Sequence, residues 1–597
     1  MKNRKASPIG RMLKYAWDDD KQIYFYCALY SLFAVSVPII SVALPKVIIG
    51  YLTEGEPSLQ GIVKLSLLFF IFGAAVYFLK EWLADYTYPR ITYLRIKYIK
   101  DQAVKLLTMD YKYMEQADFF NSREKALEAT SSNTNGIEGI YHKLFDIPQL
   151  ILIVIALSVF IGLKSIWILI ALIVHIFVTS YIAILVQKYQ YKRKEELSKK
   201  ERRVAYYSAT SKDFAYGKDI RVYDLKTRIL MNFQKEISGY LDVFRVIKNK
   251  EYLLGLISLF TLVVADIASY GILTYLTVKG MSIADYSMYV AASVVLTLQM
   301  TALSENITFI MQEYMYVKDL YNFFDEDLGE KGGELNAVAE DMPIEIEFID
   351  VNFKYPGTDK PIFTDFSLHI PAGSKLALVG INGAGKTTFV KLLTGMFKAD
   401  SGKILINGHD VNEYDKQELF SMFCVVFQEV NIMALTIAQN IACSTEDIDY
   451  AKVEDVLRQV DLYDKVVSLK KGVNSMMLKI IEEDGVVFSG GENQRLTIAR
   501  ALYKGGSCVI MDEPTASLDA LAEASIYSQF DNLIHGRTAI YISHRLASTK
   551  FCDAIALIDN DGLKEYGTHD ELMALGGAYH DMFVVQGKYY QTEEEEI

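Results

Sequence analysis

The sequence predicts an all-α membrane domain of six helices, followed by an α/β domain built around a phosphate-binding loop. Three observations carry this prediction. The first half of the 597-residue chain holds six apolar runs of membrane-spanning length, a later stretch has phosphate-loop spacing, and short strands and helices alternate around that loop. A chain of this length, 51% hydrophobic, needs at least two domains.

The six apolar runs define the first domain, which we place at residues 1–325. A membrane-spanning helix needs about 20 apolar residues, and the predicted spans cover about 23–51, 61–83, 146–163, 166–187, 252–278 and 283–312. Buried helices of a soluble bundle are the alternative, which repeated runs at spanning length disfavour. The connections at 84–145 and 188–251 are rich in charge and helix formers, so we expect long cytoplasmic helical extensions.

Two aromatic-rich bends interrupt these extensions, at Met109–Ser122 and Phe214–Leu225. Exposed aromatic side chains at such tips favour docking onto another surface, and a plain turn between helices is the alternative.

Charge sets the orientation of the membrane domain. Lysine and arginine gather before the first span and after spans two and four, whereas the link at 53–60 has neither. Because basic residues favour the cytoplasmic side, we expect a multi-pass protein of the cell membrane with both termini in the cytoplasm. The net charge of -13 disfavours a nucleic-acid partner, and the five cysteines show no metal-ligand spacing.

A polar linker at 326–343 leads to the second domain, 344–590, and an acidic tail follows at 591–597. Gly380, Gly385, Lys386 and Thr387 have the spacing G-x-x-x-x-G-K-T between an expected strand and an expected helix. Such glycines let backbone N–H groups converge on phosphates, the lysine bridges the β and γ phosphates, and the threonine hydroxyl ligates Mg²⁺. The loop therefore predicts a nucleotide site.

A second element of this site follows the apolar strand 508–511, where Asp512 and Glu513 stand side by side. A carboxylate at the end of a strand can hold the metal through water, and its neighbour can polarise the attacking water. In this order after a phosphate loop, the pair predicts hydrolysis.

The stretch Phe488–Arg495, FSGGENQR, resembles the signature motif of ATP-binding cassette proteins. Six spans with long inner projections and one cassette resemble a half-size exporter of the type IV fold, with membrane and nucleotide-binding domains fused. The resemblance covers nearly the whole chain and implies ATP and Mg²⁺ as cofactors, in an ATP hydrolase coupled to transport.

The resemblance also implies roles for further residues. Tyr355 matches the aromatic that stacks on adenine, Gln428 the glutamine that senses Mg²⁺, Ser517–Asp519 the D-loop, and His544 the switch histidine beside the catalytic Glu513. Mg²⁺ would be held by Thr387, Gln428 and, through water, Asp512. The implied nucleotide-binding residues are Tyr355, Gly380, Asn382, Gly383, Gly385, Lys386, Thr387, Thr388, Gln428, Ser489, Gly490, Gly491 and Asp519.

The chain departs from the family pattern in two places. The signature usually reads LSGGQ, and here Phe488 and Glu492 replace its first and last residues. We expect Glu492 near a helix N-terminus, where the helix dipole offsets its charge. The usual TEVGERG stretch is LKIIEEDG, Leu478–Gly485, which puts the standard contact with the opposite membrane domain in doubt.

In this family the signature of one cassette serves the phosphate loop of another, so the resemblance implies a homodimer or a heterodimer with a related half-transporter. The favoured function is ATP-driven export by alternating access with two composite ATP sites. An ATP-gated channel or regulator is the alternative, and a chromosome-associated ATPase is excluded by the spans. The cargo stays open between lipids, drugs and peptides; Asp266 and Glu305, within the last two spans, are candidate cavity residues.

Overall fold

The computed structural model describes residues 6–54, 58–330, 332–339, 342–513, 534, 536–543, 546–559 and 562–591. The chain forms two compact units. The first comprises Met1–Leu107 with Asn121–Glu326, and the second comprises Thr108–Phe120 with Asp327–Ile597.

The first unit is all-α. Six of its helices are long and apolar enough to cross a membrane, which confirms the predicted fold class for this part. Prolines inside α2, α3 and α5 do not end these helices, as is common where neighbouring helices support the backbone. The helices are α1 (Pro8–Asp19), α2 (Gln22–Glu54), α3 (Leu59–Leu107), α4 (Ala117–Glu128), α5 (Gly136–Lys164), α6 (Ile166–Lys212), α7 (Gly217–Val222), α8 (Lys226–Val278) and α9 (Ile283–Asp325).

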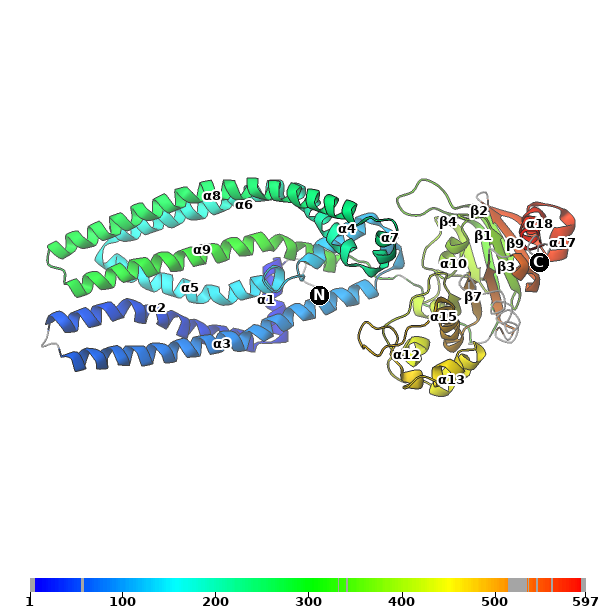
Figure 1. Ribbon diagram of the computed structural model, residues 1–597, viewed down its shortest axis with the longest axis horizontal. Helices are drawn as coiled ribbons and strands as arrows, with labels where there is room; N and C mark the ends of the chain where they lie inside the picture. Colours follow the sequence, from blue (N-terminus) through cyan, green and yellow to red (C-terminus); the bar gives the residue numbers. More distant parts are fainter. Residues whose placement is uncertain are drawn as a thin grey trace. The chain divides into compact units, whose positions relative to one another are not determined.

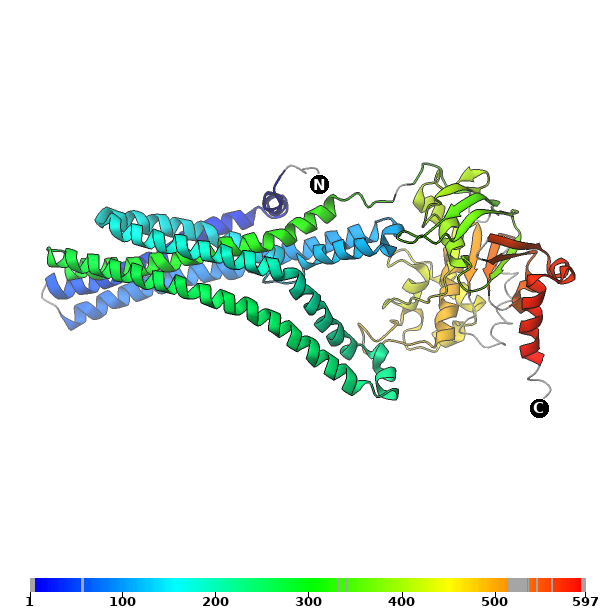
Figure 2. The ribbon, with the colours of Figure 1, turned by 90° about the horizontal axis from the view of Figure 1, so that it is seen from above.

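The long helices lie side by side, with α6 along α8 and α5 along α9 (Figure 1). Towards the end that carries α7, the pair α6 and α8 bends away from α3 and α9 (Figure 2). Large apolar side chains such as Phe70, Phe177 and Phe260 are about 70% exposed on the outside of the unit. Such an apolar exterior fits a lipid environment, and the chain is a multi-pass membrane protein.

Helix α1 was not predicted from the sequence, because it is amphipathic and too short to span. Pro8 occupies its first turn and the Ser7 hydroxyl accepts a hydrogen bond from the Gly10 N–H, so the helix has a regular N-terminal cap. Met12 and Ala16 form its buried face.

The second unit contains two sheets. One is antiparallel, in the order β2-β1-β4-β5, and the other runs β10-β9-β3-β8-β7-β6 with parallel pairing except between β9 and β10. The strands are β1 (Ile346–Phe353), β2 (Phe363–Ile370), β3 (Lys375–Gly380), β4 (Ser401–Ile406), β5 (His409–Asp410), β6 (Phe423–Val426), β7 (Cys508–Asp512), β8 (Thr538–Ile542), β9 (Ala554–Asp559) and β10 (Gly562–Gly567).

Among the described residues, three hydrophobic cores organise this unit, the third of which joins β3 and β9 to Leu572 and Tyr579. The first combines residues of both sheets with α10. The second packs α12, α13 and α15 against β6, β7 and β8. The helices are α10 (Lys386–Leu393), α11 (Lys416–Ser421), α12 (Ile437–Ala442), α13 (Tyr450–Gln459), α14 (Tyr463–Val467), α15 (Gly490–Lys504), α17 (His569–Leu575) and α18 (Ala578–Gln591).

The first aromatic-rich bend lies mostly within Thr108–Phe120, which is part of the second unit. A short 3₁₀ helix, Tyr111–Glu115, forms there. The Tyr111 ring lies 5.8 Å from the Phe397 ring, and the Lys391 ammonium pairs with the Glu115 carboxylate at 2.6 Å. This bend therefore packs on the α/β unit, as an aromatic docking segment would.

The second bend forms a short 3₁₀ helix, Phe214–Tyr216, followed by α7. Its apolar side chains face solvent in the single chain, with Phe214 97%, Val222 77% and Tyr223 70% exposed.

Candidate nucleotide-binding site

Three described loops of the second unit meet because of the direction of the strands that precede them. Strands β6, β7, β8 and β3 are parallel neighbours, so their carboxyl ends lie at the same edge of the sheet. Ligands of open α/β sheets bind at this edge. The phosphate loop follows β3, Asp512 and Glu513 end β7, and Gln428 follows β6. The topology thus gathers residues that are up to 133 positions apart in the chain, from Gly380 to Glu513.

The phosphate loop has the backbone that its glycines allow. Gly385, at the N-cap of α10, has φ 97°, a conformation that residues with a Cβ rarely adopt. Gly380 ends β3 so close to β9 that a Cβ there would lie 2.2 Å from the Ile558 carbonyl oxygen. Asn382 and Gly383 lie between them in the loop, and the N-terminus of α10 follows directly.

Lys386 is buried, and its ammonium donates to the carbonyl oxygens of Gly380 at 2.9 Å and Ile381 at 3.2 Å. Burial lowers the pKa of Lys386 because it penalises the charged form, and the nearby Glu513 and Asp512 carboxylates oppose that shift. The loop therefore holds a cation against its own carbonyl groups at the point where phosphates are expected.

Asp512 is 2% exposed, and its Oδ2 accepts a hydrogen bond from the Thr387 hydroxyl at 3.2 Å. Burial raises the pKa of Asp512, while the Thr387 hydrogen bond lowers it. The contact joins the first turn of α10 to the end of β7.

The Glu513 carboxylate accepts a hydrogen bond from Gln428 Nε2 at 2.8 Å. The backbone of Glu513 is in the left-handed region, at φ 51°, and its N–H donates to the Ile542 carbonyl at 2.9 Å. Gln494 Nε2 donates to the Glu513 carbonyl at 3.2 Å. Gln494 was not predicted from the sequence, and its place five residues after Ser489 was the available signal.

The site offers the oxygen donors that Mg²⁺ prefers: the Thr387 hydroxyl, the Asp512 carboxylate and the Gln428 amide oxygen. The amide oxygen is oriented by the hydrogen bond that its own nitrogen donates to Glu513. The residues present therefore fit the implied cofactor.

Tyr355 lies over the first turn of α10, where its hydroxyl is 2.9 Å from the Thr388 hydroxyl. Its ring packs edge-to-face on Phe397 at 5.4 Å, and the Lys391 ammonium lies 5.4 Å from the ring centre. Phe397 and Lys391 were not predicted from the sequence; Lys391, five residues after Lys386, lies on the same helix. The aromatic ring is thus close to the phosphate loop, as a base-stacking residue must be.

The signature stretch belongs to the second hydrophobic core, whereas the phosphate loop adjoins the first. Ser489 is the N-cap of α15, Gly490 and Gly491 form its first turn, and Phe488 is buried in the second core. The phosphate loop leads instead into α10, whose Phe389 and Val390 belong to the first core. Ser489 and Gly490 are exposed in the single chain.

Glu492 occupies the third position of α15, close to the helix N-terminus as expected. Its carboxylate accepts from the Ser489 N–H at 2.8 Å, and the Ser489 hydroxyl accepts from the Glu492 N–H, which is a capping box. Burial raises the pKa of Glu492, but hydrogen bonds from Lys465 and the Ser489 N–H outweigh it, and the pKa is lowered overall.

The second departure, 478–485, is a loop held by Lys471, which pairs with Glu482 at 3.0 Å and Asp484 at 3.3 Å. Ile480 and Ile481 are 75% and 70% exposed. The acidic residues are therefore bound within the unit, and the apolar pair faces outward.

Two of the predicted site residues, Asp519 of the D-loop and the switch residue His544, lie outside the described residues, as do Ser517 and Leu518.

The two candidate cavity residues lie in the first unit. Asp266 on α8 is half-buried and interacts electrostatically with His175 of α6, whose Nδ1 lies 2.9 Å from the Thr261 hydroxyl. Glu305 on α9 is exposed in the single chain, and its neighbour Ser304 bonds Ser180 at 2.9 Å.

Comparison with known proteins agrees with this geometry. Residues 363–516 match the sequence family described as "ABC transporter". The ATP-dependent lipid A-core flippase of Escherichia coli (strain K12) is 35% identical over 261 residues, 44% of this chain and 44% of that protein. The flippase of Salmonella typhimurium (strain LT2) is 37% identical over 243 residues, 40% of this chain and 41% of the flippase. These matches span less than half the length of the relatives.

Among solved structures, a bacterial Atm1-family ABC exporter with ATP bound has a TM-score of 0.79 at 21% sequence identity, covering 95% of this chain and 98% of that one. The shared fold extends over both units, whereas the family match lies in the second. Residues 363–516 thus match the ABC transporter family, and the chain as a whole has the fold of that exporter, in which six apolar helices are fused to one cassette.

Proposed function

We propose that the protein binds and hydrolyses ATP and uses the energy to export a substrate across the cell membrane. The observation that carries this proposal is the placement of Glu513 against Gln428, and of Asp512 against Thr387, at the loop edge of the parallel sheet. A hydrolytic pair of carboxylates beside a phosphate loop, in a chain with six apolar helices, fits a pump better than a passive channel.

Each residue of the site has a part in this reaction. The loop glycines and Lys386 hold the β and γ phosphates, and Tyr355 supports the adenine ring. Glu513 accepts a proton from the attacking water, and Gln428 orients that carboxylate by its hydrogen bond. Thr387, Gln428 and Asp512 would hold Mg²⁺, and the bound ion would supply positive charge for the phosphate groups.

We propose that the working form is a dimer. The Ser489–Gly491 donors belong to a different core from the phosphate loop, and Ser489 and Gly490 are exposed in one chain, so a second cassette is the natural recipient. Both halves of a site are present in this one sequence, which favours a homodimer. The exposed Phe214, Val222 and Tyr223 at the second bend offer an apolar surface that a second copy would cover.

We propose that both termini lie in the cytoplasm, because basic segments precede the first span and follow the second and fourth. ATP would then bind on the inner side, and closure of two cassettes would be transmitted through the helical extensions. Alternation between inward and outward openings is the transport cycle that we propose.

Asp266 and Glu305 are proposed to face the translocation cavity. A carboxylate in contact with lipid is costly, by about 2.5–3.5 kcal/mol on insertion scales. Asp266 has a neighbouring imidazole in His175, and exposed Glu305 needs water or a second subunit over it. These groups favour a cargo with cationic or polar parts.

The test is transport by the purified chain in proteoliposomes, with a panel of fluorescent lipids, amphipathic cations and peptides added in turn. We expect one class to stimulate ATP hydrolysis and to move across the bilayer only with MgATP. ATP-dependent ion conductance without cargo movement or turnover would identify the gated-channel alternative instead.

A further inference from the structure

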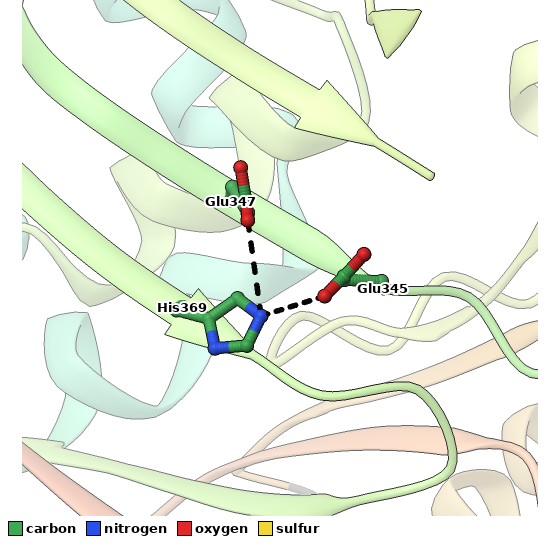
Figure 3. A group of neighbouring side chains, drawn as sticks. All are labelled: Glu345, Glu347 and His369. Atoms are coloured by element: carbon green, nitrogen blue, oxygen red, sulfur yellow. Dashed lines mark hydrogen bonds and ion pairs between the residues drawn. The ribbon is translucent and has the colours of Figure 1, made fainter. Parts of the chain in front are cut away.

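A cluster of three potential metal ligands lies on the antiparallel sheet of the cassette (Figure 3). Glu345 directly precedes β1 and Glu347 is its second residue, and their side chains lie on the same face. His369 on β2 pairs directly with Glu347 in the strand register. His369 Nε2 lies 2.8 Å from a Glu345 carboxylate oxygen and 3.9 Å from a Glu347 carboxylate oxygen.

The backbone fixes this arrangement. Ile346 pairs with Ile370 on one side and with Ile406 on the other. The Glu345 N–H donates to the Asn407 side-chain oxygen at 2.8 Å, and the Glu345 carbonyl accepts from the Asn407 N–H at 2.9 Å. The ligand-bearing ends of the two strands are therefore held in place on both sides.

The charge of the cluster is not balanced by ordinary ion pairs. Among the described residues, neither Glu345 nor Glu347 pairs with a lysine or arginine, and His369 is the partner of both. An open surface pocket of about 500 Å³ is lined by Glu347 and His369 together with Leu563 and Tyr566 of β10, which leaves room for a further ligand or water.

We propose that Glu345, Glu347 and His369 form a binding site for one divalent transition metal of the Zn²⁺ or Co²⁺ class. Metal–ligand distances of about 2.0–2.2 Å place neighbouring donor atoms about 3.0–3.5 Å apart. The donor atoms here all lie within 4.8 Å of one another, so small rotations of exposed glutamate side chains complete the geometry. One imidazole and two carboxylates favour a borderline metal over Mg²⁺ or Ca²⁺.

The position of this cluster separates it from the nucleotide site. β1 runs from the cluster towards Tyr355, and β2 returns to His369 from the Tyr355 end. Metal binding therefore links β1 and β2 at the ends that are remote from Tyr355, and it uses no residue of the ATP site. Because the metal binds the folded sheet, its binding raises thermal stability.

The experiment uses the full chain in detergent, without a histidine tag, nucleotide-free and freed of metal with a chelator. Co²⁺ is titrated at pH 7.5 and followed by visible absorption and calorimetry, with Zn²⁺ as a competitor. His369→Ala and Glu347→Gln are compared with His409→Ala, a matched control in which an exposed histidine faces a single carboxylate, Glu413, at 3.7 Å.

We expect the wild type and His409→Ala to bind one equivalent of Co²⁺. His369→Ala should lose this binding, and Glu347→Gln should bind Co²⁺ at least tenfold more weakly. Zn²⁺ should raise the Tm of the wild type and leave that of His369→Ala unchanged. Equal Co²⁺ binding by the wild type and His369→Ala would overturn the proposal. So would an absence of binding by the wild type, since the cluster would then be only a histidine held between two carboxylates.

Discussion

Glu513→Gln tests the assignment of the catalytic base. An amide oxygen can still accept the hydrogen bond from Gln428, so the site keeps its shape, but an amide cannot accept the proton of the attacking water. General-base catalysis contributes about 10²–10⁴-fold, which corresponds to about 3–5 kcal/mol of transition-state stabilisation. The variant should therefore hydrolyse ATP at least 100-fold more slowly.

Binding of MgATP should survive this substitution. Glu513 carries negative charge beside the phosphates, and its removal leaves Lys386 and the loop glycines in place, so affinity should be unchanged or higher. Phosphate release by the reconstituted chain measures turnover, and a fluorescent ATP analogue measures binding. Glu429→Gln, which removes the same charge from an exposed neighbour of Gln428, is the control and should stay near wild type. Turnover of Glu513→Gln within about fivefold of wild type would refute the assignment.

Four further predictions concern the site, the subunits and the cavity. Lys386→Ala should weaken MgATP binding at least tenfold, because a buried cation is lost from the loop; equal affinity would contradict that role. Tyr355→Ala should raise KM for ATP about 3–10-fold through lost stacking, whereas Tyr355→Phe should stay within about twofold. The chain purified alone should show steady ATPase activity that Ser489→Ala lowers at least tenfold; an inert wild-type chain would indicate a heterodimer. Asp266→Asn should abolish transport of a cationic cargo and retain basal ATPase activity, and unchanged transport with unchanged stability would remove Asp266 from the cavity.

The sequence was most informative where function depends on local spacing. A few consecutive residues were enough to predict each motif: the phosphate loop, the pair Asp512 and Glu513, and the SGG stretch. Strand direction then brings the first two to one edge of the sheet. The membrane spans could be predicted equally well from the apolar runs, because a bilayer imposes a minimum length on every span.

Contacts between separate segments of the chain could not be predicted in this way. The Glu345–Glu347–His369 cluster depends on the register between β1 and β2, which no short motif encodes. Helix α1 and the docking of Tyr111 beside Phe397 were missed for a related reason, since amphipathic and aromatic segments acquire meaning only from the surface that receives them. The aromatic-rich bend was evident in the sequence, but neither its partner nor helix α1 was.

The altered signature illustrates how a departure from a family pattern can be accommodated by structure. Glu492 adds a negative charge at the point where the signature would approach a phosphate. The capping box and Lys465 of α14 both act on that carboxylate, and they hold it on the α15 backbone. The Ser489 hydroxyl accepts from the Glu492 N–H, so its own hydrogen remains available to donate. The substitution therefore leaves the hydroxyl and glycine donors of the signature in place, and its charge is offset by a lysine 27 residues earlier in the chain, outside the motif itself.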